Sequence, residues 1–229
     1  MNYLVSVFFS PSEAYRQIKE REIILLPIIL ILLVLGGTSL LLHPISARDN
    51  AQLVSQNPRL SEMLTEEQIE SIRNPSTSRM VIGSVMHPVS SIVGCLIYAL
   101  LLMIIANAAG CDLSYKKVFS AILLSSLISP VLSTLFKTPV IMAKGTALGV
   151  STSLSLLSPD SPFTSITFQI LEVFDLFSIW ALVVLIAGIS VLAGIGKQKA
   201  AGIVVTAWII KNAGLILFSM ISLKLSGVS

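Results

Sequence analysis

Ile23 to Leu42 reads IILLPIILILLVLGGTSLLL, a run without a charged side chain that decides the fold. Twenty residues in a helix rise by about 30 Å, which matches the hydrocarbon core of a bilayer. Pro27 falls in the first turns of this helix, where the missing backbone N–H costs least. The segment therefore predicts a transmembrane helix over residues 23–42.

The rest of the chain repeats this pattern. We expect four further membrane spans, over residues 89–109, 118–136, 171–195 and 201–221. Of 229 residues, 54% are hydrophobic and only 12% are charged, whereas an average soluble protein carries about 25% charged residues. A chain of this composition lacks the polar residues needed to cover its surface in water. The sequence predicts an all-α fold, a polytopic membrane protein formed by a bundle of about five transmembrane helices.

Two polar segments flank the first span. Residues 1–22 predict a cytoplasmic amphipathic helix at the membrane surface, started by the capping box SPSE at residues 10–13. Residues 23–229 then form the five-span membrane domain, with an extracytoplasmic loop over residues 44–79. Within that loop, the motif TEEQ at residues 65–68 is a second capping box that opens a short polar helix.

Prolines and small polar residues interrupt the later apolar segments. His87-Pro88 is expected to separate a short lead-in from the second span. Pro130 predicts a kink in the third span, where nearby serines can bond to the freed backbone or to a neighbouring helix. Residues 137–161 are rich in Ser, Thr and Gly and only moderately apolar, so they predict a re-entrant or interfacial segment.

Loop charges give an orientation. The two shortest loops carry Lys116, Lys117, Lys197 and Lys199, and the positive-inside rule places them in the cytoplasm. The N-terminus is then cytoplasmic and the C-terminus extracytoplasmic. Cys111, beside one of these loops, should escape an impermeant thiol reagent applied to intact cells. No basic patch with interleaved aromatic residues occurs, so nucleic acid is not an expected partner.

Lys211 is the most informative single residue. It lies about 18 Å past the basic turn at Lys199, near the membrane midplane. A lysine there costs about 2.5–3.5 kcal/mol on insertion scales, so it should face the bundle interior or water. It is either a counter-charge in a substrate or ion pathway or a structural lysine. A depth mismatch of roughly 15 Å argues against a pair with Asp175, which leaves Tyr98 and Ser125 as the expected neighbours.

Glu172 and Asp175 form the second candidate. Their spacing of three places both on one helix face, as in a carboxylate pair for metal or proton chemistry. The simpler interpretation is two interfacial acids stabilised by the helix dipole. His43 and His87 fall near the outer surface, but two histidines without a further ligand are a weak metal signal. We expect no catalytic residue, no metal and no cofactor.

Two short motifs resemble a known family. FFSPSEAY at residues 8–15, followed directly by a span, and FDLFSIW at residues 174–180 are similar to bacterial members of the Yip family of Ypt/Rab-interacting proteins. The five-span layout and the basic turn at residues 196–199 agree with this resemblance. It implies an integral protein of the bacterial cytoplasmic membrane without catalytic residues. The Tyr-Asp-Leu-x-Gly-Pro type motif of eukaryotic members, which are linked to vesicle trafficking and Rab binding, is absent.

Three functions are compatible with the sequence. The first is a non-enzymatic membrane adaptor or scaffold that binds other membrane proteins or lipids, as the resemblance implies. The alternative is a small transporter, channel or accessory subunit of an exporter, with Lys211 in the pathway. The third is a membrane enzyme acting on lipid, although no Walker loop, GxSxG or HExxH motif occurs. Expected partners are the lipid bilayer, other membrane proteins and, as an option, further copies of the chain; Cys95 and Cys111 predict free thiols.

Overall fold

Five long helices form the body of the molecule. The computed structural model describes residues 3–20, 23–56, 63–158, 161 and 165–225. Among these residues, five helical rods are long and apolar enough to cross a membrane, which confirms the all-α membrane fold. They are α3 (Leu25–Gln56), α6 (Thr77–Ala108), the rod of α7 (Tyr115–Ser126), η1 (Leu127–Leu132) and α8 (Ser133–Lys144), then α10 (Leu176–Ala193) and α11 (Lys197–Leu225).

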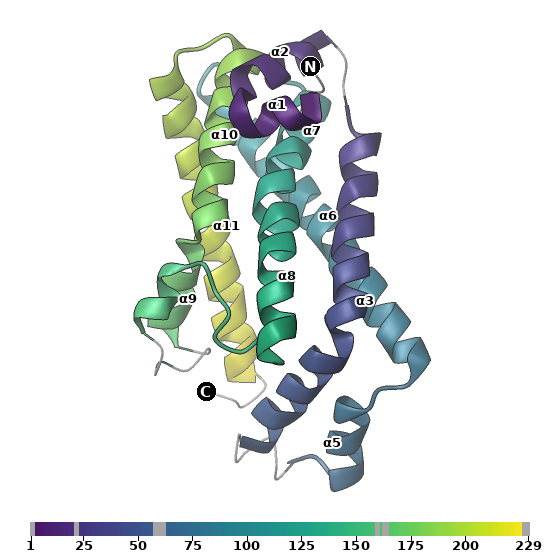
Figure 1. The fold of residues 1–229 in the computed structure, drawn as a ribbon. Coiled ribbons are helices and arrows are strands. Elements are labelled where there is room, and N and C mark those ends of the chain that lie inside the picture. The colour runs from purple at the N-terminus through teal and green to yellow at the C-terminus, as the bar shows by residue number, and fades with distance from the viewer. Residues whose placement is uncertain (1–2, 21–22, 57–62, 159–160, 162–164, 226–229) are drawn as a thin grey trace.

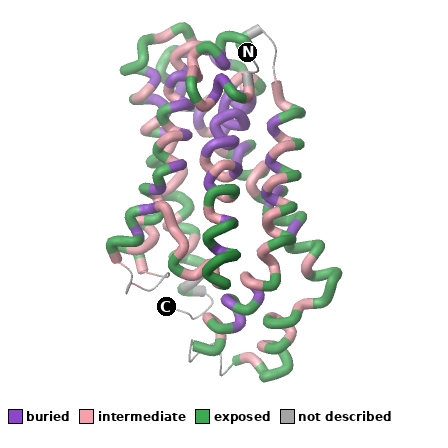
Figure 2. Tube along the Cα trace, viewed as in Figure 1, coloured by how far each residue is buried: buried purple, intermediate pink, exposed green. Residues whose placement is uncertain are grey.

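The two ends of the bundle differ. Two short helices, α1 (Tyr3–Phe9) and α2 (Pro11–Glu20), lie across one end, which we call the N-terminal end. The last turns of α11 lie toward the opposite end, as an odd number of crossings requires (Figure 1). Buried residues concentrate at the N-terminal end, whereas the opposite end is largely exposed (Figure 2). In α7, every residue from Val118 to Ser126 is buried. The bundle is therefore tightly packed in one half and open in the other.

Helices α1 and α2 do not simply lie on the membrane surface, as the sequence suggested. Tyr15 of α2 is fully buried, and its hydroxyl donates a hydrogen bond to the backbone oxygen of Ala121 at 3.0 Å. Its ring rests on Gly188 of α10, where an added Cβ would come within 2.6 Å of the ring. The apolar face of α2 therefore packs into the N-terminal end of the bundle rather than into lipid.

The first two long helices extend beyond the expected spans. Helix α6 runs unbroken through Pro88, so the expected division at His87-Pro88 is wrong. A proline removes one backbone bond of a helix without ending it when neighbouring helices support the kink. Helix α3 likewise continues through Pro44 and well into the expected loop at 44–79. Its buried Asp49 explains the extension, because the carboxylate ties α3 to the turn after α8.

The contacts of Asp49 are short and specific. Its carboxylate accepts a hydrogen bond from the Thr146 hydroxyl at 2.8 Å and from the Ala147 backbone N–H at 2.7 Å.

Further along the same insertion, α5 (Glu66–Arg73) begins at Thr65. The expected reciprocal capping box between Thr65 and Gln68 is confirmed. Residues 44–56 and 63–79, the described parts of the insertion, are thus mostly helical rather than a loop.

The third rod contains a π-helical turn, η1, at the place where Pro130 predicts a kink. The wider turn accommodates the proline ring within a continuous rod. The nearby serines bond as expected: Ser125 and Ser126 donate to the backbone oxygen of Ile122, and Ser129 bonds to Ser178 of α10 at 3.1 Å. Residues 137–144, expected within an irregular segment, instead continue this rod as the end of α8.

The fourth span is broken near its start. Residues 171–195 were expected to form one helix, but α9 (Ile166–Val173) ends before Asp175 and α10 begins after it. Asp175 is the N-cap of α10, because its carboxylate accepts from the backbone N–H groups of Phe177 and Ser178 at 3.0 and 3.1 Å. Aspartate is among the strongest N-cap residues, so it starts a new helix here. Between α8 and α9, the chain forms extended segments and a short 3₁₀ turn, η2 (Leu154–Leu157).

Candidate functional site

A cavity of about 930 Å³ opens inside the less densely packed half of the bundle. It lies between α6, the α7–η1 rod, α9, α10 and α11, and most of its lining is apolar. The polar residues that matter for its chemistry are Tyr98, Ser125, Ser129, Glu172 and Lys211. Lys211 and Glu172, two of the candidates from sequence, therefore line one cavity. Asp175 is not part of its lining.

Lys211 contacts an aromatic ring rather than an acid. Its Nζ lies 5.1 Å from the ring centroid of Tyr98, a cation–π contact that confirms Tyr98 as a neighbour. Ser125, the other expected neighbour, lines the same cavity. Among the described residues, Lys211 forms no ion pair, so its charge has no acidic partner within this part of the chain.

Lys211 and Asp175 do not pair, as expected, but the expected reason is wrong. Helix α10 ends at Ala193 and α11 already begins at Lys197, so Asp175 lies less far from the turn than a count from Lys197–Lys199 suggested. The Phe174 ring packs edge-on against Trp208, with centroids 5.8 Å apart, and Trp208 precedes Lys211 by one helical turn. The depth mismatch is therefore small. Asp175 is unavailable to Lys211 because it faces Lys137 of α8 instead.

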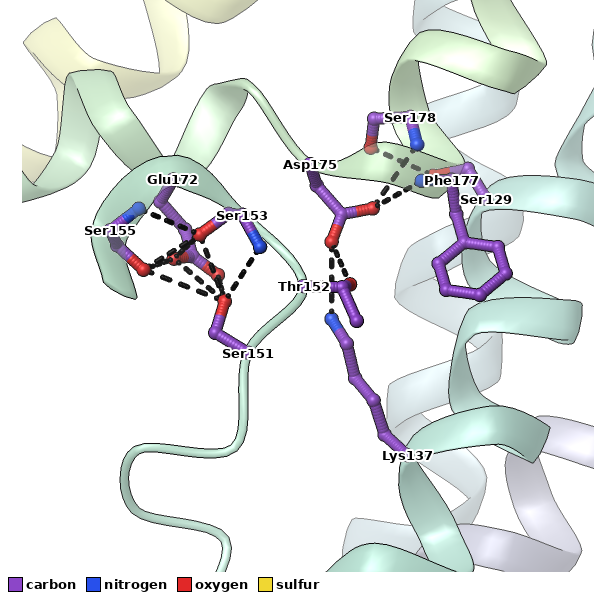
Figure 3. Close-up of polar contacts among 10 residues, drawn as sticks. All are labelled: Ser129, Lys137, Ser151, Thr152, Ser153, Ser155, Glu172, Asp175, Phe177 and Ser178. Carbon is purple, nitrogen blue, oxygen red and sulfur yellow. Dashed lines mark hydrogen bonds and ion pairs between the residues drawn. The ribbon is translucent and has the colours of Figure 1, made fainter. Parts of the chain in front are cut away.

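The Asp175 carboxylate is held by three elements (Figure 3). Besides capping α10, it accepts a hydrogen bond from the Thr152 hydroxyl and pairs with Lys137 Nζ at 3.4 Å. The Thr152 hydroxyl, the Lys137 ammonium and the backbone N–H of Ser178 all stabilise the charged form of this carboxylate. The carboxylate is thus an ionised structural group that joins α8, α10 and the segment before η2.

Glu172 has a different set of partners. Its carboxylate accepts hydrogen bonds from the hydroxyls of Ser153 and Ser155, each at 2.6 Å, and lies 3.4 Å from the Ser151 hydroxyl (Figure 3). These serines alternate with Thr152, whose hydroxyl faces Asp175. The extended backbone at Ser153 directs successive side chains to opposite sides, and Ser155 follows within the turn η2, so one short segment serves both carboxylates separately.

This arrangement corrects the expected carboxylate pair. Glu172 ends one helix and Asp175 starts the next, so the two side chains do not share a helix face. No group of three or more His, Cys, Asp or Glu that could hold a metal occurs among the described residues. Lys137, Thr152 and the three serines escaped the sequence analysis. The only available signal was the polar alternation STSLS at residues 151–155.

The remaining candidates are two cysteines and two histidines. Cys95 and Cys111 are free and buried, and the Cys95 thiol lies 3.3 Å from the Ser126 hydroxyl. His43 has a buried Nδ1 without a hydrogen-bond partner in the described chain, and His87 is exposed on α6. Neither histidine lines the cavity. The cavity therefore contains one cation, Lys211, whose partner the described chain does not supply.

The comparison with known families is decisive for identity. A family model described as the Yip1 domain matches residues 5–220, nearly the whole chain. The chain belongs to the Yip1 domain family. Neither the curated proteins nor the solved structures contain a significant match. Both motifs that carried the resemblance prove to be junctions of this Yip1 domain: residues 8–15 join α1 to α2, and residues 174–180 join α9 to α10.

These junctions define what the Yip1 domain can do chemically. The α1–α2 junction places Tyr15 in the packed N-terminal end of the bundle. The α9–α10 junction places Asp175 and Glu172 around a hydroxyl-rich segment. Both carboxylates are already engaged by hydrogen-bond donors of the chain itself. The cavity offers a cation, a carboxylate held by serine hydroxyls, an aromatic ring and apolar walls, which suit binding of an amphipathic molecule.

Proposed function

We propose that this Yip1-domain protein is a non-enzymatic integral membrane adaptor that binds other membrane proteins or lipids. The observation that carries the proposal is that Glu172 and Asp175 are both held by hydrogen bonds within the chain. Glu172 is bonded to serine hydroxyls, and Asp175 is bonded to a helix N-terminus and Lys137. General acid–base chemistry needs a group that can reach a substrate proton, and these carboxylates face their own chain. What remains is a membrane-embedded binding surface.

The alternative, a transporter or channel with Lys211 in its pathway, is favoured by the cavity itself. A route across the bundle would also have to pass its N-terminal end. There Tyr15, Leu123 and Val184 are almost fully buried, and Tyr15 fills the space beside Gly188. This packing favours a binding site over a through-path. Reconstituted vesicles showing flux that the Lys211→Met variant abolishes would reverse this preference.

Purification from native membranes tests the adaptor proposal. We expect the full chain, extracted in mild detergent, to retain a membrane protein in fixed stoichiometry, identified by mass spectrometry. The Lys211→Met variant is the matched control. It changes the cavity but not the lipid-facing helix surfaces, so an adaptor that binds through those surfaces should keep its partner. A chain that emerges without a protein partner would contradict the protein-binding part of the proposal and leave lipid binding as its remaining part.

The proposed location is the bacterial cytoplasmic membrane, with the N-terminus in the cytoplasm. Because Cys111 is only 5% exposed, its lack of labelling would say nothing about sidedness. Single cysteines at exposed positions give a sharper test: Asp112→Cys and Glu67→Cys, each in a Cys95→Ser, Cys111→Ser background. An impermeant maleimide on intact cells should label the Glu67 variant, and the Asp112 variant only after permeabilisation. The reverse pattern would invert the orientation.

A further inference from the structure

We propose that the cavity around Lys211 is a lateral binding site for an anionic membrane phospholipid, with the Lys211 ammonium binding its phosphate. This inference rests on the proposed function and names the class of one ligand. It follows from three features of the cavity: an uncompensated charge, an opening toward lipid, and a hydrophilic segment at the depth of the lysine.

The charge of Lys211 lies near the membrane midplane. A charged lysine there has a high free energy unless it meets water or an opposite charge. The two described acids considered as its partners bind other groups. Asp175 pairs with Lys137, and Glu172 accepts hydrogen bonds from Ser153 and Ser155. The ring of Tyr98 offers only a cation–π contact. A phosphate from outside the chain would supply the missing anion through a charge-assisted hydrogen bond.

The Tyr98 side chain flanks the same site. Lys211 Nζ lies 5.1 Å from its ring centroid, and both residues line the cavity. The Tyr98 hydroxyl is shielded from the open cavity as well as from solvent, so the donor assigned to the phosphate is the Lys211 ammonium.

The apolar lining and the lateral opening of the cavity favour a lipid over a soluble anion. Its volume of about 930 Å³ falls near the upper end of the range for ligand sites, and such sites are mostly apolar. Ile97 of α6 and Leu215 of α11 line it and are also 65% and 58% exposed. Residues exposed on these outer helices face the hydrocarbon in a membrane, so the cavity opens sideways to lipid. The packed N-terminal end closes the aqueous route on that side.

The broken fourth span explains how a head group reaches such depth. The α9–α10 junction brings Glu172 and the serines around it within about one helical turn of the Lys211 level, as the Phe174–Trp208 contact shows. A polar surface therefore enters the membrane beside the cavity. A head group can follow this surface inward while its acyl chains stay against α6 and α11.

The test uses the purified, delipidated full chain in detergent. Phosphatidylglycerol, phosphatidylcholine and soluble glycerol phosphate are titrated separately, and binding is measured by native mass spectrometry and by the shift in melting temperature. We expect phosphatidylglycerol to bind and stabilise the wild type, and phosphatidylcholine and glycerol phosphate to do so much less. Lys211→Met should weaken phosphatidylglycerol binding by about tenfold or more, since a charge-assisted contact is lost. Lys211→Arg should retain it, and Lys224→Met, which removes an exposed lysine of the same helix, should leave it unchanged.

A second variant keeps the test independent of folding effects at Lys211. Gly94 lines the cavity, and no atom lies within 4 Å of the position of an added Cβ. Gly94→Leu should therefore fit the fold, narrow the cavity and weaken lipid binding while Lys211 remains. Equal phosphatidylglycerol binding by wild type, Lys211→Met and Gly94→Leu overturns the inference, as does equal stabilisation by glycerol phosphate.

The two proposals fail separately. A chain that keeps its protein partner but shows no preference for phosphatidylglycerol overturns the lipid site and leaves the adaptor proposal standing. A chain that binds phosphatidylglycerol through Lys211 but purifies without a protein partner supports the lipid site and narrows the adaptor proposal to lipid binding.

Discussion

Gly188→Ala is expected to detach the N-terminal helices and destabilise the protein by about 1–3 kcal/mol, the range typical of overpacking in a filled core. The added Cβ would lie 2.6 to 2.8 Å from three carbons of the Tyr15 ring. Tyr15 is fully buried and bonded to Ala121, so its ring cannot move aside without losing that contact. Thermal unfolding in detergent should show the loss, and limited proteolysis should cut within α1 and α2.

A neighbouring glycine provides the control. Gly202 of α11 has no atom within 4 Å of an added Cβ, so Gly202→Ala should be neutral or stabilising. Tyr15→Ala removes the clash but also the buried ring, at a cost of about 3–5 kcal/mol by analogy with other aromatic truncations. The double variant should then be no less stable than Tyr15→Ala alone, because the two residues contact each other. Additive losses would show that the ring does not rest on Gly188.

Asp175→Ala is expected to destabilise the protein by about 3–5 kcal/mol. The substitution leaves Lys137 without its partner at a site where the lysine side chain is only 22% exposed. It also removes the N-cap of α10 and the acceptor of Thr152. Because three elements lose their common contact, we expect faster hydrogen exchange at residues 146–158 together with a lower melting temperature. Asp112→Ala, at an exposed acid, should change neither.

Much of the architecture follows from hydrophobic runs, because a span needs only length and the absence of charge. The two capping motifs also locate the starts of α2 and α5. Other features depend on contacts between distant residues and leave no local pattern. Nothing near Gly188 indicates that Tyr15 fills the space beside it, and nothing near Asp175 indicates Lys137. Helix continuity across Pro88, and its loss at Asp175, reflect competition between local caps and neighbouring helices.

The candidate site was partly predictable for the same reason. A charge within an apolar run marks Lys211 from sequence alone, and its neighbour Tyr98 follows from depth. The cavity itself does not, because its lining comes from five helical segments that are distant from one another in the sequence. The depth of the α9–α10 junction is therefore the part of the site that only the structure reveals.

The docking site of Tyr15 also determines when, during synthesis of the chain, the N-terminal helices can pack. Helices α1 and α2 leave the ribosome first, but their docking surface needs Ala121 and Gly188, which are made much later. At roughly 5–20 residues per second, the delay is on the order of ten to thirty seconds. During that time the N-terminal helices wait undocked while four spans enter the membrane. Protection of α1 and α2 from protease on arrested nascent chains should therefore appear only after Gly188 has emerged, which makes the first residues of the chain a reporter of its completed insertion.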